Sequence, residues 1–310
     1  MSNGSFPPTF RRPSGLLLAV AVLLVAGAAG WLAWSAFAGD GSGERGGRAP
    51  HASGEPAGGP GGKSPDASPD PAGDRPGADP SGDAGDRSLR GKVVVIDPGH
   101  NPHNGEHAAK IARTVDVGTH KKECDTVGAA TASGYSEAEY TLDVARRVRR
   151  LLEDRGAEVR LTQDGDRPYG PCVDERAEIG NRAHADAVVS VHADGSGTGN
   201  RGFHVIAPAR VRAGKADTSA ITGPSRTLAD RLIDRFGRAT GAAPANYLGG
   251  GSGLTVRDDL GGLNLSAVPK VFIECGNMRD SEDAALLTDA RWRERAARGI
   301  ADGVTDFLRD

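Results

Sequence analysis

Residues 92–100 read KVVVIDPGH, and this stretch decides the fold class. The β-branched run over 92–97 is typical of a central strand that is buried on both faces. The Pro98-Gly99 pair then forces a turn, which exposes His100 at the rim of the predicted sheet. Similar runs predict further strands at 157–162, 187–192, 202–207 and 268–275.

Helical periodicity separates these strands. One helix begins at Ser136, where Ser136 and Glu139 form a capping box, and ends at Gly156. Further helices are expected over 173–185, 225–240 and 281–308, the last interrupted near Gly299, whereas 98–134 has no clear period and is expected to be a long loop. Alternating strands and helices predict an α/β fold, a three-layer sandwich with a mostly parallel sheet.

The N-terminal part of the chain has a different composition. Residues 1–14 are expected in the cytoplasm, because Arg11 and Arg12 precede an apolar run at 15–38. That run is long enough for a transmembrane anchor, and a signal peptide cut after residue 38 is the alternative. Residues 39–88 lack every large apolar side chain and are expected to be a disordered linker. Residues 89–310 then form one extracytoplasmic domain.

Potential metal donors gather where predicted strands end. His100, His192 and Glu274 lie at the carboxyl ends of predicted strands, and Glu137 opens a helix. Ligands bind at the carboxyl ends of parallel strands, so one shared site is expected there. Two imidazoles and one carboxylate can hold zinc with an open fourth position, and a second carboxylate can act as base and acid.

Each donor has a simpler alternative. His100 fits a surface loop, and Glu137 fits a carboxylate that interacts with the helix dipole. His192 and Glu274 are harder to explain this way, because both end apolar strands where an unpaired polar group is costly. His204 lies in a strand with alternating apolar and polar residues, so its side chain is expected either in the core or facing the cleft.

The three cysteines are Cys124, Cys172 and Cys275. An exported domain meets oxidising conditions, so one disulfide and one free thiol are expected. Cys275 ends an apolar strand and is expected to be buried, whereas Cys124 and Cys172 lie in Gly- and Pro-rich loops where pairing is easy. We therefore expect a Cys124–Cys172 bond, with three reduced cysteines as the alternative.

Four motifs in order carry a family resemblance: VVVIDPGH, GYSEAEYTLDVARRVRRLLEDRG, AVVSVHAD followed by GFHV, and IECGNM. With these, residues 92–308 resemble the zinc-dependent N-acetylmuramoyl-L-alanine amidases of type 3, which cut bacterial peptidoglycan. The stretch PCVDER at 171–176 and a cysteine in the preceding loop are similar to actinobacterial members, whose disulfide supports the same cysteine pair. The family fold is a twisted, mixed sheet flanked by helices.

The resemblance also implies roles for single residues. His100, Glu137 and His192 match the zinc ligands, and the motif register selects Glu137 over Glu139. Glu274 matches the catalytic glutamate, and we expect Asp97 to orient His100. The implied activity is hydrolysis of the amide bond between the lactyl group of N-acetylmuramic acid and L-alanine.

Two features of the sequence differ from parts of the family. The run 101–133 lacks the usual Gly-Gly after the first histidine, and 162–186 is too short for an inhibitory helix. Peptidoglycan is the expected partner of a monomeric enzyme, and a net charge of −3 argues against nucleic acid. A non-catalytic peptidoglycan-binding module and another zinc wall hydrolase, a peptidase or deacetylase, are the alternatives.

Overall fold

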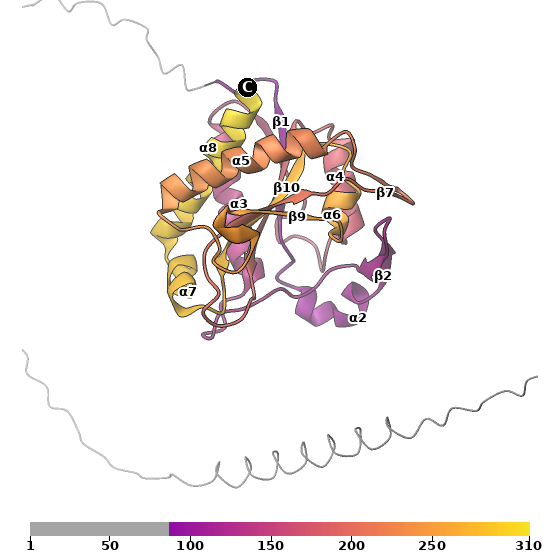
Figure 1. Ribbon diagram of the computed structural model, residues 1–310. Coiled ribbons are helices and arrows are strands. Elements are labelled where there is room, and N and C mark those ends of the chain that lie inside the picture. Colours follow the sequence, from indigo (N-terminus) through magenta and orange to yellow (C-terminus); the bar gives the residue numbers. More distant parts are fainter. Residues whose placement is uncertain (1–86) are drawn as a thin grey trace, which may run out of the picture. The chain divides into compact units, whose positions relative to one another are not determined.

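A computed structural model describes residues 87–310 of the chain (Figure 1). The predicted cytoplasmic segment, the anchor or signal peptide at 15–38 and nearly all of the linker at 39–88 lie outside these residues. Between residues 87 and 310, no helix has the length and apolar character needed to cross a bilayer.

The predicted α/β fold is confirmed, and its centre is a mixed six-stranded sheet. The strands, in spatial order, are β4 (Glu158–Leu161), β1 (Val93–Pro98), β5 (Ala187–Asp194), β10 (Lys270–Asn277), β6 (His204–Pro208) and β9 (Leu254–Arg257). Neighbouring strands are parallel except for β10 and β6, which are antiparallel. The carboxyl ends of β1, β5 and β10 therefore meet at one edge of the sheet.

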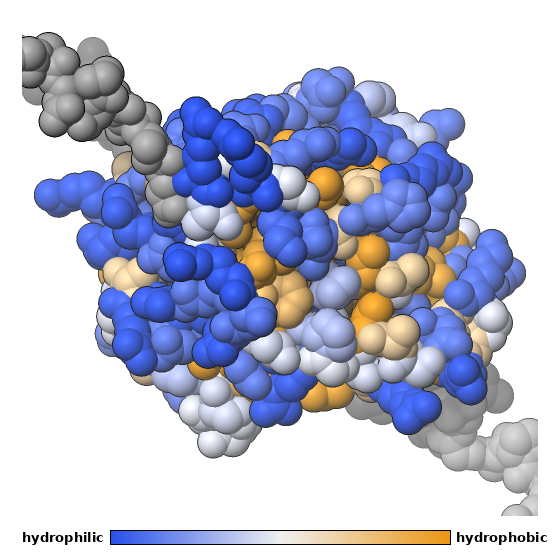
Figure 2. All heavy atoms as spheres, turned by 90° about the horizontal axis from the view of Figure 1, so that it is seen from above, coloured by the Kyte–Doolittle hydropathy of each residue, from blue (hydrophilic) through white to orange (hydrophobic). Residues whose placement is uncertain are grey.

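One face of the sheet forms the main hydrophobic core. Three helices cover it, namely α3 (Glu137–Glu153), α5 (Thr222–Thr240) and α8 (Ala290–Arg309). Their side chains pack with Val94, Val189 and Ile273 of the sheet. Seen from above the view of Figure 1, the surface is mostly hydrophilic, with a smaller central area of hydrophobic residues (Figure 2).

The opposite face of the sheet is covered less completely. Here α4 (Val173–Arg182) packs its Ile179 against a small cluster that includes Val95 and Val188. The short helix α6 (Gly261–Asn264) lies beside α4, on the opposite side of the molecule from α8 (Figure 1). Because side chains alternate along a strand, residues next to the core positions of β1, β5 and β10 point to this second face.

The region 98–134, predicted as a loop, contains short elements. They are a 3-10 turn η1 (Asn104–His107), α2 (Ala108–Ile111) and a hairpin of β2 (Thr114–Asp116) and β3 (Lys121–Glu123). The remaining elements are β7 (Arg212–Ala213), β8 (Ala216–Asp217), η2 (Gly249–Gly251) and α7 (Ser281–Thr288).

Two features of the helices test the local predictions. The capping box is confirmed, because the Ser136 hydroxyl accepts from the Glu139 amide while the Glu139 carboxylate accepts from the Ser136 amide. The predicted interruption near Gly299 is wrong: the break lies at Asp289, whose carboxylate caps α8 by accepting from the Trp292 amide at 2.7 Å. Gly299 lies inside α8, where a Cβ would come within 2.8 Å of Phe236 Cα.

Candidate metal and catalytic site

The second face of the sheet carries polar and charged side chains in register. Asp97 pairs with Ser190 across β1 and β5, and His192 pairs with Glu274 across β5 and β10. Phe272 pairs with Ser190 and lies between them on the same face. The sheet thus brings three of the predicted site residues, Asp97, His192 and Glu274, to one side.

The structure brings the three predicted ligands together. Glu137 Oε2 lies 3.2 Å from His100 Nε2, and Glu137 Oε1 lies 3.0 Å from His192 Nδ1. One donor atom from each residue lies within 4.8 Å of the other two, a spacing that a single metal ion can bridge. Glu139, the neighbouring carboxylate, is instead held in the capping box of α3.

The position of His100 depends on a tight turn after β1. His100 has a φ of 61°, in the left-handed region that non-glycine residues rarely adopt. Arg176 Nη2 donates to the His100 carbonyl at 2.8 Å and holds this turn. Gly99 is required next to it, because a Cβ at this position would collide with the ring of His192.

The hydrogen bonds of His100 select which ring nitrogen faces the cluster. Its Nδ1 lies 3.0 Å from the carbonyl oxygen of Thr126, and it donates there when protonated. Nε2 is then the ring nitrogen that faces Glu137, 3.2 Å from Oε2. Burial opposes protonation of the ring, but Glu137 and Asp125 raise the pKa of His100 to about 10, so the imidazolium pairs with Glu137, and a metal ion would bind Nε2 in place of its proton.

Glu137 is fixed by backbone donors as well as by the two imidazoles. It is the first residue of α3, and it accepts from the amides of Ala129 at 2.8 Å and Ala193 at 3.2 Å. Burial opposes its ionisation, but the imidazoles of His100 and His192 outweigh burial and hold the pKa of Glu137 well below its usual range. Glu137 is therefore an ionised, oriented carboxylate.

Glu274 is a half-buried residue with a carboxyl group of the opposite kind. Its Oε2 has no hydrogen-bond partner within the described part of the chain. Burial and then the nearby Glu137 carboxylate raise the pKa of Glu274 well above its usual range. A group with this environment can hold a proton near neutral pH, which is what an acid-base residue requires.

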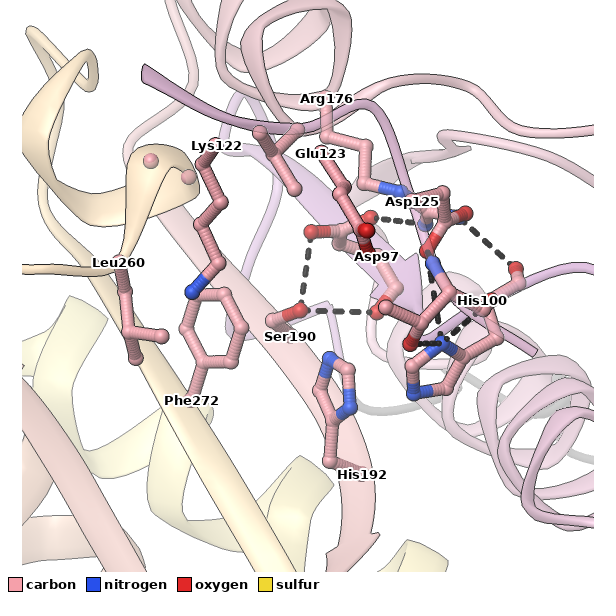
Figure 3. A pocket seen from close by; sticks show the side chains of 14 residues that line it. Asp97, His100, Lys122, Glu123, Asp125, Arg176, Ser190, His192, Leu260 and Phe272 are labelled. Atoms are coloured by element: carbon pink, nitrogen blue, oxygen red, sulfur yellow. Dashed lines mark hydrogen bonds and ion pairs between the residues drawn. The ribbon is translucent and has the colours of Figure 1, made fainter. Parts of the chain in front are cut away.

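Two cavities meet at the cluster. One, of about 290 Å³, is lined by Glu137, His192, Glu274 and Arg257. The other, of about 380 Å³, lies on the other side of Phe272, where Figure 3 shows Lys122, Leu260 and Arg176 around it. Since His100, His192 and Phe272 line both cavities, the cluster lies at their junction.

Asp97 has contacts other than the predicted ones. Its carboxylate accepts from Thr162 Oγ1 at 2.7 Å, Ser190 Oγ at 2.9 Å, Arg176 Nη1 at 2.8 Å and Lys270 Nζ at 3.0 Å. Burial opposes ionisation here too, but Lys270 and Arg176 hold the pKa of Asp97 well below its usual range. Asp97 thus anchors a buried ion network, and its hydrogen bonds do not go to the His100 ring.

Asp125 and Arg176 are the neighbours of His100 that the sequence reasoning missed. Asp125 Oδ1 lies 3.4 Å from His100 Nδ1, and Arg176 Nη2 donates to Asp125 Oδ2 at 3.0 Å. Arg176 therefore links Asp97, Asp125 and the His100 backbone. The sequence does contain a signal for both residues, because each lies close to a cysteine of the predicted disulfide. Asp125 follows Cys124, and Arg176 lies in the PCVDER stretch after Cys172.

The predicted disulfide is confirmed. Cys124 and Cys172 are bonded, which ties the Asp125 loop to the residue that precedes α4. Cys275 is a buried free thiol, as expected from its place at the end of an apolar strand.

Comparison with known proteins agrees with this geometry. The protein-family model Amidase_3, described as N-acetylmuramoyl-L-alanine amidase, matches residues 94–306. The N-acetylmuramoyl-L-alanine amidase Rv3717 of Mycobacterium tuberculosis is 40% identical over 230 residues, which are 74% of this chain and 91% of that protein.

Two solved structures of mycobacterial amidases are also similar. Ami1 of Mycobacterium smegmatis is 39% identical with a TM-score of 0.65, and the match covers 71% of this chain and 98% of that one. Ami1 of Mycobacterium abscessus is 38% identical with a TM-score of 0.64, and the match covers 71% of this chain and all of that one (100%). The chain therefore belongs to the Amidase_3 family of N-acetylmuramoyl-L-alanine amidases, and these three mycobacterial relatives are actinobacterial members of that family.

Proposed function

We propose that the domain hydrolyses the amide bond between the lactyl group of N-acetylmuramic acid and L-alanine of the peptidoglycan stem peptide, using a zinc ion held by His100, Glu137 and His192. The observation that carries this assignment is the carboxyl group of Glu274, whose Oε2 is buried without a hydrogen-bond partner among the described residues, beside the three converging donors. A binding module has no need for such a group, because its burial is costly without a chemical use.

The donor set fits zinc in number and chemistry. Two imidazole nitrogens and one carboxylate leave a fourth position open, as in catalytic zinc sites. When bound, zinc supplies Lewis-acid chemistry: it polarises the scissile carbonyl and lowers the pKa of a bound water towards about 7. The chain orients its ligands through backbone groups, with the Thr126 carbonyl on His100 and two amides on Glu137.

Glu274 moves the protons of the reaction. Its carboxylate takes a proton from the attacking water, and the resulting carboxylic acid gives that proton to the leaving amine of L-alanine. The raised pKa of Glu274, caused by burial and by Glu137, favours the protonated form from which the second transfer starts. One product is a glycan whose lactyl group carries a free carboxylate, and the other is a free stem peptide with an L-alanine amino terminus.

We further propose that the enzyme is a monomer that acts outside the cytoplasmic membrane. The apolar run at 15–38 supports this placement, either as an anchor or as a signal peptide. The linker at 39–88 would then let the domain reach the wall from the membrane.

Metal analysis and digestion of peptidoglycan test the proposal together. The full chain is purified, its zinc content is determined, and new L-alanine amino termini are assayed after incubation with peptidoglycan. One zinc per chain with new alanine termini is the expected result. His192→Ala should abolish both, whereas His103→Ala, a change in an exposed loop residue, should affect neither.

The alternatives give different results in the same assay. One zinc with cleavage at a different bond would identify another wall hydrolase. Absence of both zinc and cleavage would favour a binding module and refute the assignment.

A further inference from the structure

Arg257 is a cationic side chain in the catalytic cavity that the proposed reaction does not use. It is the last residue of β9, and it lines the cavity of about 290 Å³ together with His192 and Glu274. Thr255 pairs with Ile206, and Ile206 pairs with Phe272, so Thr255, Arg257 and Phe272 share the polar face of the sheet. Arg257 thus faces the same cleft as the catalytic carboxyl group.

The guanidinium of Arg257 is held in a fixed orientation. Its Nε donates to Asp259 Oδ1 at 2.7 Å, and its Nη2 donates to Asp259 Oδ2 at 2.5 Å. Nη1 has no partner among residues 87–310. Asp259 therefore occupies one edge of the fork, and the other edge keeps N–H donors for a ligand, in a planar geometry that matches a carboxylate.

The charge of the cavity makes this donor distinctive. The acidic groups that line it are Glu137, Asp194 and Glu274, and Arg257 is the only Lys or Arg among the described residues that do so. Asp194 is already engaged, because it accepts from the hydroxyl of Tyr247 at 2.6 Å. An anionic group that enters this cavity away from the proposed zinc ligands therefore has Arg257 as its cationic side-chain partner.

The proposed function fixes which part of the substrate passes Arg257. Glu274 gives its proton to the leaving amine, so the amine, and the peptide that continues from it, lie on the Glu274 side of Phe272. Two extended peptide residues span about 7 Å. Strand β6 lies between β10 and β9, so the backbones of β10 and β9 are about 10 Å apart, which is twice the distance between neighbouring strands. The long side chain of Arg257 spans part of this distance towards Glu274, since both residues line the same cavity. The second residue of the leaving peptide is therefore the one that meets Arg257.

We propose that Arg257 binds a free carboxylate on the second residue of the stem peptide and makes this amidase selective for acidic stems over amidated ones. The inference rests on the proposed function, because it uses the direction in which Glu274 transfers its proton. In this proposal Arg257 determines substrate specificity, and Asp259 positions Arg257.

Lys122 is the competing cation. It belongs to β3 and lines the other cavity, of about 380 Å³, together with Phe272 and Leu260 (Figure 3). Glu274 does not line that cavity. Since the leaving amine must reach Glu274, Lys122 lies on the side of the lactyl group and the glycan.

The test uses two muramoyl peptides that differ only at the second stem residue, which carries a free carboxylate in one and a primary amide in the other. The readout is kcat/KM for release of the L-alanine amino terminus by the zinc-loaded full chain. The wild type should prefer the carboxylate substrate by about tenfold, the factor that corresponds to about 1.4 kcal/mol. Arg257→Gln should bring the ratio close to 1, and Arg257→Lys, which keeps the charge and loses the fork, should fall between.

Two matched variants complete the design. Lys122→Gln removes the other cation, and Arg238→Gln removes an exposed arginine of α5 that pairs with Asp234. Both should keep the wild-type ratio. An equal rate on the two substrates by the wild type, an unchanged ratio in Arg257→Gln, or loss of the ratio in Lys122→Gln would each overturn the proposal. If the wild type releases no alanine terminus from either substrate, the proposed function itself fails.

Discussion

His204 makes the stability of the domain depend on pH in a way that can be calculated. It lies in β6 opposite Glu274, it is only 2% exposed, and its Nδ1 has no hydrogen-bond partner in the described part of the chain. Burial lowers the pKa of His204 from 6.5 to about 4. The folded protein therefore keeps this imidazole neutral at pH values where the unfolded chain protonates it.

The sign follows from proton binding. Between pH 6.5 and 4 the unfolded state binds more protons at this residue, so the free energy of unfolding rises with pH in that window. The contribution of neutral His204 is fully present above pH 6.5 and is lost as the pH falls to about 4. The pKa difference corresponds to a loss of about 3 kcal/mol.

The assay is urea unfolding of the zinc-free protein at several pH values between 7 and about 4, in a chelator so that metal release adds nothing. His204→Leu removes the titrating group, and its unfolding free energy should fall by about 3 kcal/mol less than that of the wild type over this range. His103→Gln, which changes an exposed histidine, should behave like the wild type. Parallel pH profiles of the wild type and His204→Leu would refute the reasoning.

Three further predictions concern turnover, the disulfide and helix packing. Glu274→Gln should keep one zinc per chain and lose about 10²- to 10⁴-fold in turnover, checked by metal analysis and the release of alanine amino termini; a fully active variant would remove Glu274 from the mechanism. Replacing Cys124 and Cys172 by serine should lower the free energy of unfolding by about 4 kcal/mol in urea titrations, because the bond closes a loop of 48 residues. Gly299→Ala should lower the melting temperature, since its Cβ would press on α5 at 2.8 Å from Phe236 Cα. Gly237→Ala, inside α5 where an added Cβ would meet its nearest neighbour at an ordinary 3.6 Å, should instead raise the free energy of unfolding by up to about 1 kcal/mol, and the same sign for both alanines would contradict the packing argument.

The elements and the metal ligands were predictable because their signals are local. The β-branched run before Asp97 is buried on both faces of the sheet, and Ser136 and Glu139 determine where α3 begins. The three donors follow such signals directly, since each stands next to a strand end or a helix start. The structure shows that they converge, while their roles as zinc ligands stay a proposal.

What the sequence reasoning missed depends on long-range contacts. Strand β9 has only four residues, and its pairing with β6 determines its conformation, so its own pattern gave no prediction. Gly299 favours a helix break by propensity, but close packing against α5 requires a glycine at this position. Asp97 lies on the strand face that points to Lys270 and Arg176, whereas the left-handed turn directs His100 elsewhere.

The helices cover the two faces of the sheet to different extents, and this difference affects how such enzymes can acquire new specificities. The face under α3, α5 and α8 supplies most of the buried apolar contact, and the face with Phe272 and Arg257 carries the proposed catalytic site. Substitutions at the exposed positions of β9 and of the β2–β3 hairpin therefore cost little folding free energy, while the core tolerates few changes. Selection for new wall chemistries can act on β9 and the β2–β3 hairpin with the scaffold left intact, and a library confined to those two segments would remain largely folded.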